Sequence, residues 1–163
     1  MADATFTWIP TREVPTDYQV TQSSGIIFDT NGNLLIGSMH SNNEWNLFGG
    51  SPEEGESALD ALLRECIEEG DVKIKNIHLL GVFHVHFLQN PNPKEGEDFY
   101  QARYIADIDE LLPQTPDPDE KEITIWQRIL VPAETITNYI DWGENGKRMF
   151  QEAIKLHSSL SQK

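Results

Sequence analysis

The sequence has few basic residues and almost no cysteine. Lys and Arg together number 12, against 27 Asp and Glu, which gives a formal net charge of −15 over 163 residues. Binding to a nucleic acid polymer or to an anionic membrane normally requires a cluster of Lys and Arg, so we expect neither as a partner. The single cysteine, Cys66, excludes an internal disulfide and a cysteine-based zinc site.

Long apolar runs and targeting features are also missing. No run is long or apolar enough to cross a bilayer, and residues 1–5 lack the basic start of a signal peptide, so we expect a cytoplasmic protein. The length and the 38% apolar content predict one domain over residues 1–163. Within it, residues 1–17 are expected to form an N-terminal arm or an edge strand, because prolines interrupt the segment.

The stretch from Gly49 to Val72 has the strongest pattern in the chain. It begins with a glycine pair and continues through a loop into an amphipathic helix. Ser57 is expected to cap the start of that helix, with Asp60 three residues later. The apolar side chains of the helix fall on one stripe, which predicts that this stripe packs on the core.

Three glutamates share a different face of the predicted helix. Glu65, Glu68 and Glu69 stand at positions i, i+3 and i+4, and like charges at this spacing destabilise a helix by roughly 0.2–0.5 kcal/mol per pair. A bound Mg²⁺ would offset this repulsion, since it prefers carboxylate oxygens and substrate phosphates as ligands. The alternative is a solvated acidic face, which is common on glutamate-rich helices.

The residues around these acids favour the metal site. Together the stretch resembles the Nudix box, G-x5-E-x7-R-E-U-x-E-E-x-G-U, in which U is a bulky apolar residue. Seven positions agree over one continuous spacing, which makes the match specific; they are Gly50, Glu56, Arg64, Glu65, Glu68, Glu69 and Val72. Cys66 occupies the first U position, where a small hydrophobic side chain is acceptable.

The sequence departs from the box pattern at the end of the helix. The late glycine of the family falls at Asp71, whereas this chain has the order Gly70-Asp71. Either the helix ends one residue early with Gly70 in the left-handed conformation, or Asp71 adopts that conformation. We expect the early end, because a residue with a Cβ loses roughly 1 kcal/mol or more there.

The remaining segments predict strands on both sides of the box helix and a helix at the end of the chain. This order indicates a mixed α/β protein, and the resemblance implies a Nudix-type α/β/α sandwich with a mixed central sheet. The expected elements are strands at 19–28, 34–37, 45–48, 72–75, 79–88, 99–105 and 123–131, a helical turn at 107–112, and helices at 132–140 and 144–160.

The resemblance also implies a chemistry and assigns residues to it. It implies a divalent-metal-dependent hydrolase that uses activated water to cleave the pyrophosphate bond of a nucleoside diphosphate linked to another moiety. The cofactor would be Mg²⁺ or Mn²⁺, and the partner a small phosphorylated substrate. The expected catalytic residues are Arg64, Glu65 and Glu69; the expected metal ligands are Glu65, Glu68 and Glu69; the expected phosphate loop contains Gly49, Gly50 and Glu56.

The catalytic base stays open at this stage, because family members take it either from the box or from a downstream loop. Besides Glu65 and Glu69, the candidates are Glu97, Glu120 and Glu122. The oligomeric state is also open, and a homodimer remains one alternative. His84 and His86 point to the same side of a predicted strand, but a zinc site would need a third ligand.

Two other functions are weighed against hydrolysis. A Nudix-fold nucleotide-binding module without turnover would usually have lost its acids, and they are intact here. An isoprenoid diphosphate isomerase of this family relies on a cysteine and a histidine-bound metal outside the box. Because Cys66 lies inside the box helix, we rank the isomerase last.

Overall fold

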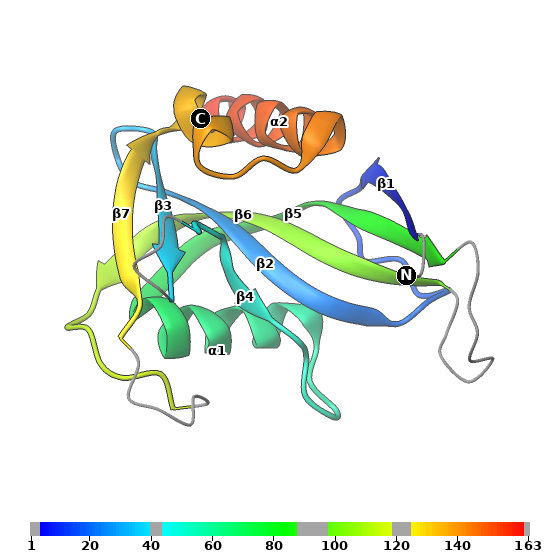
Figure 1. Ribbon diagram of the computed structural model, residues 1–163, viewed down its shortest axis with the longest axis horizontal. Helices are drawn as coiled ribbons and strands as arrows, with labels where there is room; N and C mark the ends of the chain where they lie inside the picture. Colours follow the sequence, from blue (N-terminus) through cyan, green and yellow to red (C-terminus); the bar gives the residue numbers. More distant parts are fainter. Residues whose placement is uncertain (1–3, 40–43, 88–97, 119–124, 162–163) are drawn as a thin grey trace.

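The fold is a central sheet enclosed by two helices. The computed structural model describes residues 4–39, 44–87, 98–118 and 125–161. Helix α1 (Ala58–Gly70) covers one face of the sheet, and helix α2 (Gly143–Ser161) covers the other (Figure 1). The predicted α/β/α sandwich with a mixed sheet is therefore confirmed.

Seven strands make up the sheet in the described part of the chain. The order is β1-β5-β6-β2-β3-β7, and β4 pairs with β2 outside this path. Only one of these pairings, β2 with β6, is parallel. The strands are β1 (Ala4–Pro10), β2 (Val20–Phe28), β3 (Asn33–Ser38), β4 (Phe48–Gly50), β5 (Val72–Phe87), β6 (Asp98–Leu111) and β7 (Gln127–Pro132).

Alternation along the strands divides the core into two layers. Ile26 and Phe28 of β2 pack in the layer that contains Phe150 of α2, whereas Ile27 packs in the layer that contains Leu62 of α1. Successive side chains of a strand point to opposite faces, so each helix covers one apolar surface of the same sheet. A short 3-10 helix, η1 (Ala133–Asn138), connects β7 toward α2.

Strand β2 has two different neighbours on one side, and this arrangement positions the glycine pair. Its end pairs with β3 at residues 27 and 28, whereas its middle pairs with β4, where Ser24 lies opposite Gly49 and Ser23 opposite Gly50. The chain then continues from β4 into α1. The glycine pair is thereby held between the middle of the sheet and the helix that carries the acids.

The predicted helical turn at 107–112 is wrong. Strand β6 continues through Leu111, because it pairs with the first part of β5. Cross-strand ion pairs support this pairing: Lys73 Nζ lies 3.5 Å from Glu110, and Lys75 Nζ lies 3.8 Å from Asp109. The two strands predicted at 72–75 and 79–88 form one strand, β5, with a register shift near Asn76.

The start of α1 agrees with the expectation, but its end does not. Ser57 Oγ accepts a hydrogen bond from the Asp60 N–H at 3.1 Å. At the other end Gly70 is the last helical residue, and Asp71 has the left-handed conformation, with φ 48° and ψ 44°. The predicted early end is wrong, and the family register is kept despite the reversed residue order.

The surroundings explain why the two residues stand in this order. A Cβ on Gly70 would lie 3.1 Å from both Phe48 and Val72, so tight packing favours glycine there. The Asp71 carboxylate accepts hydrogen bonds from the Thr115 N–H at 2.8 Å and from the Thr115 hydroxyl at 2.9 Å. Arg128 Nη1 also donates to the Gly70 carbonyl at 2.9 Å. The strained residue therefore anchors the loop that follows β6.

We expect Asp71→Gly to lower the melting temperature, although glycine relieves the backbone strain. The relief is roughly 1–2 kcal/mol, whereas each hydrogen bond to a charged group contributes about 1.5–3 kcal/mol, and two are lost. Thermal melts of Asp71→Gly and of the near-isosteric Thr115→Val test this, because Thr115→Val removes only the hydroxyl bond. A more stable Asp71→Gly protein would show that strain outweighs the loop contacts.

Candidate active site

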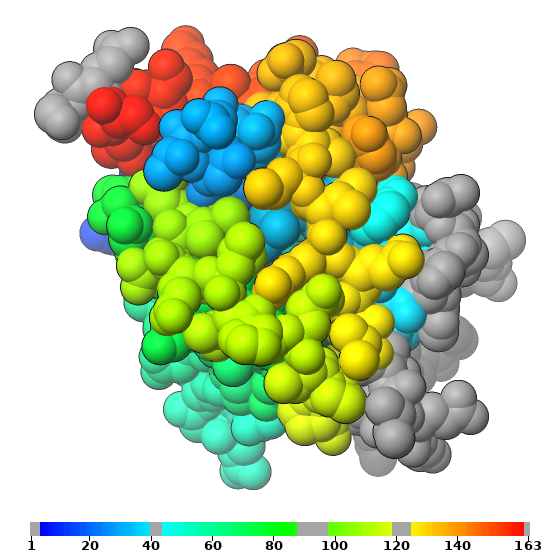
Figure 2. Space-filling view, turned by 90° about the vertical axis from the view of Figure 1, so that its left-hand side faces the viewer, coloured from blue at the N-terminus to red at the C-terminus, as the bar shows by residue number. Residues whose placement is uncertain are grey.

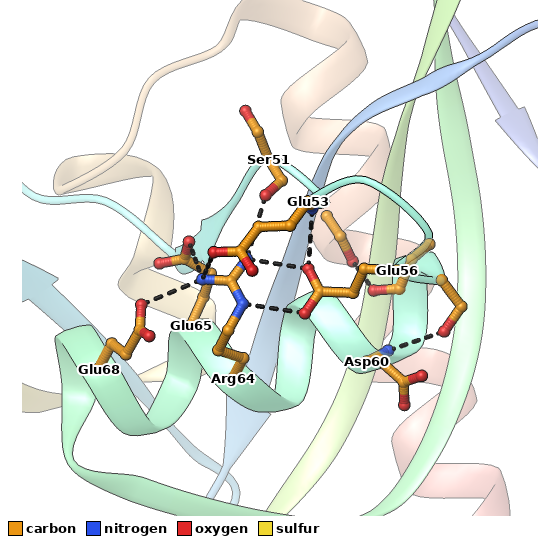
Figure 3. A network of polar contacts seen from close by, with 10 residues as sticks. Ser51, Glu53, Glu56, Asp60, Arg64, Glu65 and Glu68 are labelled. Atoms are coloured by element: carbon orange, nitrogen blue, oxygen red, sulfur yellow. Dashed lines mark hydrogen bonds and ion pairs between the residues drawn. The ribbon is translucent and has the colours of Figure 1, made fainter. Parts of the chain in front are cut away.

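Arg64 lies at the centre of the acidic face of α1. Its Nε and Nη2 donate to the two carboxylate oxygens of Glu56, each at 2.9 Å, and its Nη1 donates to Glu65 at 2.9 Å and to Glu68 at 3.0 Å (Figure 3). Nη2 also donates to the Ser51 carbonyl at 3.2 Å. The Arg64 guanidinium therefore binds the loop before α1 through Ser51 and Glu56, and it also binds Glu65 and Glu68 of the helix.

This pairing fixes the charge states of Arg64 and Glu56. The hydrogen bonds from Arg64, with a further bond from the Glu53 N–H, lower the pKa of Glu56 to about 2. The same contact with Glu56 raises the pKa of Arg64 above its usual range, and Glu65 adds to this effect. Both groups are therefore charged at neutral pH. Their hydrogen bonds are charge-assisted, and such bonds are the stronger ones.

Glu69 has the opposite electrostatic environment. Its Oε1 accepts a hydrogen bond from the Gly49 N–H at 3.0 Å, but burial raises its pKa to about 8, and the charges of Glu65, Asp117 and Glu68 act in the same direction. The main cause is the loss of hydration on burial, which disfavours the charged carboxylate, and the nearby negative charges add to it. The protonated form of Glu69 is therefore favoured in the metal-free protein near neutral pH.

The glycine pair allows β4 to approach the acids and the neighbouring strand. A Cβ on Gly50 would lie 2.5 Å from Glu65 Oε1, and a Cβ on Gly49 would lie 2.2 Å from the Ser23 carbonyl oxygen. The short distance at Gly49 involves the backbone of Ser23, so only glycine keeps this geometry, whereas at Gly50 the Glu65 carboxylate would have to move. The structure thus places Gly50 beside Glu65, and the Gly49 N–H against Glu69.

The structure adds one acid that the sequence analysis missed. Asp117 is 6% exposed, accepts a hydrogen bond from Trp126 Nε1 at 2.9 Å, and contributes to the raised pKa of Glu69. Residues 108–118 and 125–132 run side by side on the molecular face shown in Figure 2. The only signal in the sequence was the acidic, proline-rich composition of this loop.

The remaining predicted residues are the candidate bases outside the box and the two histidines of β5. Glu97, Glu120 and Glu122 lie outside the described residues. His84 and His86 both contact Asp98 Oδ1, at 2.7 and 2.8 Å, and this bond lowers the pKa of Asp98. Within residues 4–39, 44–87, 98–118 and 125–161, no three His, Cys, Asp or Glu side chains converge as a ready-made metal shell.

The sequence matches one known protein family. The model of the NUDIX domain family matches residues 20–152, which contain most of the sheet, all of α1 and the first half of α2. The chain belongs to this family. The prediction of a Nudix-type pyrophosphohydrolase is thereby confirmed at the level of the family. A search of curated proteins found no match to this chain.

Solved structures of several Nudix proteins are similar to this one. A Bacillus subtilis pyrophosphohydrolase, BsRppH, superposes with a TM-score of 0.64 at 19% identity over 97% of this chain and 92% of that chain. The MutT protein of Bacillus halodurans gives 0.60 at 19% identity over 82% and 80%. A NUDIX hydrolase from Nitrosomonas europaea gives 0.57 at 16% identity over 86% and 90%. At these identities, the likeness establishes the fold.

The raised pKa of Glu69 predicts how pH changes the stability of the metal-free protein. Between the usual pKa of glutamate and about 8, the folded state binds more protons at this site than the unfolded state, so this contribution to stability falls as pH rises. We expect Glu69→Gln to remove that contribution and to melt higher than wild type above pH 8, by about 2–4 °C for each kcal/mol of relieved repulsion.

Melting curves from pH 5 to pH 9 in a chelating buffer measure this difference. The matched control is Glu134→Gln, which changes an exposed glutamate on η1. The difference between Glu69→Gln and wild type should grow with pH, and that of the control should stay flat. Equal pH profiles for all three proteins would contradict the assigned environment of Glu69.

Proposed function

We propose that this protein is a divalent-metal-dependent hydrolase that cleaves the pyrophosphate bond of a nucleoside diphosphate linked to another moiety. The observation that carries this proposal is the Arg64-centred group of acids on α1, which lies against the glycine pair of β4. Nudix hydrolases generally use divalent metals and act on small phosphorylated substrates. BsRppH of Bacillus subtilis, which has a similar fold, is a pyrophosphohydrolase. This likeness supports the same reaction for the present protein.

The donor set suits a hard cation. Glu65, Glu68 and Glu69 offer only carboxylate oxygens, and the charges of Glu65 and Glu68 add to the effect of burial in raising the pKa of Glu69. Oxygen ligands of this kind are preferred by Mg²⁺ and Mn²⁺. When bound, such a cation neutralises diphosphate charge and lowers the pKa of a bound water.

The chain's own residues do the positioning. Arg64 contacts one oxygen each of Glu65 and Glu68, so it fixes the direction in which these carboxylates point. The Gly49 N–H holds Glu69 in the same way. The absence of side chains at Gly49 and Gly50 lets the phosphates approach the backbone closely.

Proton transfer from water needs a group that accepts a proton near neutral pH. Glu69 and Glu65 remain the candidates from the box, and burial raises the pKa of Glu69 to about 8. Glu97, Glu120 and Glu122 remain candidates from the sequence. A small nucleotide-derived substrate suits the net charge of −15 better than a large polyanion does.

The alternative functions have less support. Cys66 is fully buried, and burial raises the pKa of its thiol, so it is not available as the cysteine of an isoprenoid diphosphate isomerase. A binding module without turnover would need none of the contacts that hold the three acids. No helix in the described part of the chain is long and apolar enough to span a membrane. We retain the cytoplasm as the proposed location, and a homodimer as an open alternative.

We expect turnover to require Mg²⁺ or Mn²⁺. Purified protein is assayed with a panel of nucleoside diphosphate derivatives, with each cation and with a chelator, and cation binding is measured by calorimetry with and without a non-hydrolysable analogue. Activity should disappear in the chelator and return when the cation is added back. Undiminished turnover in the chelator, or no cation binding under either condition, would remove the metal site.

We also expect Glu68→Gln and Glu69→Gln each to reduce kcat without unfolding the protein. For Glu69, a candidate base, a loss of roughly 10²–10⁴-fold is typical when a positioned proton-transfer group is removed. The apo stability of Glu69→Gln should hold or rise because a buried charge is removed, whereas Glu68→Gln weakens the ion pair with Arg64 and should lower stability by at most about 1 kcal/mol. Glu134→Gln is again the control. Wild-type rates in both variants would refute the ligand assignment, and unfolded variants would assign these residues a structural role.

A further inference from the structure

Helix α1 carries an apolar stripe that faces solvent. Leu59, Leu63 and Ile67 are 39%, 37% and 38% exposed, although all three side chains are large and aliphatic. They stand four residues apart, so they are neighbours on one side of the helix. Leu62 and Cys66 are fully buried against the sheet instead. The apolar side chains of α1 therefore pack on the core only in part, and the remainder form a surface.

This stripe lies on the opposite flank of α1 from the acidic site. Each residue of an α-helix turns the chain by about 100°, which places Leu63 about 200° around the helix from Glu65, and Ile67 equally far from Glu69. In Figure 1, α1 is the outermost layer of the described chain on its side of the sheet. A partner on the stripe would thus contact α1 without covering the acids.

The stripe continues at its N-terminal end into an open groove of about 960 Å³. Leu59 belongs to both features, Val14, Val20 and Tyr104 form the other apolar walls, and residues 52–57 form the rim. The stripe itself extends over about 12 Å, or roughly two helical turns. A continuous exposed apolar surface of this kind, unlike a single exposed leucine, marks a site of association.

The rim of the groove is held in place by contacts already described. Arg64 donates two hydrogen bonds to Glu56, and the Ser57 hydroxyl caps the first turn of α1. A surface that is ordered before binding loses less conformational entropy when a partner binds. The groove and the stripe are therefore preformed for a partner of fixed shape.

The charges around this surface are acidic. Glu53 and Glu54 lie on the rim of the groove, and Asp60 stands three residues before Leu63, all three being exposed. The whole chain carries −15, so its field attracts cationic partners and repels anionic lipids and nucleic acids. A second copy of this chain would bring the same acids close to one another, which disfavours a symmetric contact.

We propose that the stripe and the groove bind a basic amphipathic helix of a partner protein. Apolar side chains of that helix, spaced three and four residues apart, pack on Leu59, Leu63 and Ile67, and its Lys and Arg side chains pair with Glu54 and Asp60. An uncharged apolar segment would use only the stripe, and an unpatterned basic segment only the acids. This contact does not depend on the proposed hydrolysis.

The probe is a synthetic helical peptide of about four turns, with leucine on one side and lysine on the other. One control peptide has the same composition in an order without an amphipathic pattern, and a second has glutamate in place of lysine. Titrations are followed by ¹H–¹³C NMR through the methyl signals of Leu59, Leu63 and Ile67. The probe should shift these signals, with a Kd that rises with salt, and neither control should.

Two results of this titration would overturn the proposal. The first is that these methyl signals do not shift with the probe at roughly millimolar concentration, the weakest binding that such a contact would give. The second is that the reordered peptide binds as tightly as the probe, because the acidic charge alone would then account for binding.

The decisive variant is Leu63→Gln, which keeps a side chain of similar size but removes the apolar contact at the middle of the stripe. It should weaken probe binding by about tenfold or more, as the loss of a central interface residue does. Leu130→Gln is the matched control, since Leu130 is 44% exposed on β7, and should keep wild-type affinity. Unchanged affinity in Leu63→Gln, or an equal loss in Leu130→Gln, would overturn the proposal. Ile67→Gln repeats the test if Leu63→Gln fails to fold.

The contribution of charge is tested in the same way. Asp60→Asn should weaken probe binding and reduce its dependence on salt, because one acid beside the stripe is neutralised. The control is Glu134→Gln, which neutralises an exposed acid on η1 and should leave both quantities unchanged. An equal effect of the two variants would show that only the net charge matters, and would overturn the proposed pairing.

Other occupants of the surface give different results. A concentration-dependent dimer in sedimentation velocity that Leu63→Gln abolishes would assign the stripe to a second copy of this chain. Binding to phosphatidylcholine vesicles that Leu63→Gln abolishes would assign it to a membrane. Either result would overturn the proposed partner. Specific probe binding by a protein that hydrolyses no diphosphate would reject the proposed reaction and keep the docking surface.

Discussion

The candidate site depends on the ion pairs of one arginine. Arg64 joins Glu56 from the loop to Glu65 and Glu68 from the helix, so four charged side chains keep one arrangement. Without this cation, acids at helical spacing would repel each other and the loop would lose its attachment. Glu69 is held separately by a backbone N–H, and burial raises its pKa to about 8. The site therefore combines acids that are paired with Arg64 and a buried carboxyl group that a backbone N–H holds in place.

The end of the box helix shows how one residue can serve both backbone and loop. Tight packing against Phe48 favours glycine at position 70, and position 71 is left-handed. Asp71 tolerates that conformation, and its carboxylate holds Thr115. The same loop contains Asp117, which lies beside Trp126 and acts on Glu69. Asp71, the residue that departs from the family pattern, thus connects the end of α1 to the loop that carries Asp117.

Local patterns in the sequence predicted the features that depend on residue spacing. They failed where residues far along the chain determine the local conformation. The box spacing identified Arg64 and the three glutamates, and the cap at Ser57 followed from its side chain. The end of the helix was mispredicted, because the compensation for Asp71 comes from Thr115, which lies far along the chain. The turn expected at 107–112 became strand because β5 pairs with it. For Asp117 the sequence offered only the acidic, proline-rich composition of its loop, because the importance of this residue arises from its burial.

The single parallel pairing has a consequence for the order in which the protein folds. Val20 lies opposite Tyr100, about 80 residues later in the chain, and closing so long a loop costs conformational entropy before any contact repays it. The antiparallel pairing of β5 with β6 is closer in sequence and needs no such closure. We therefore expect β5 and β6 to pair early and β2 to join them late.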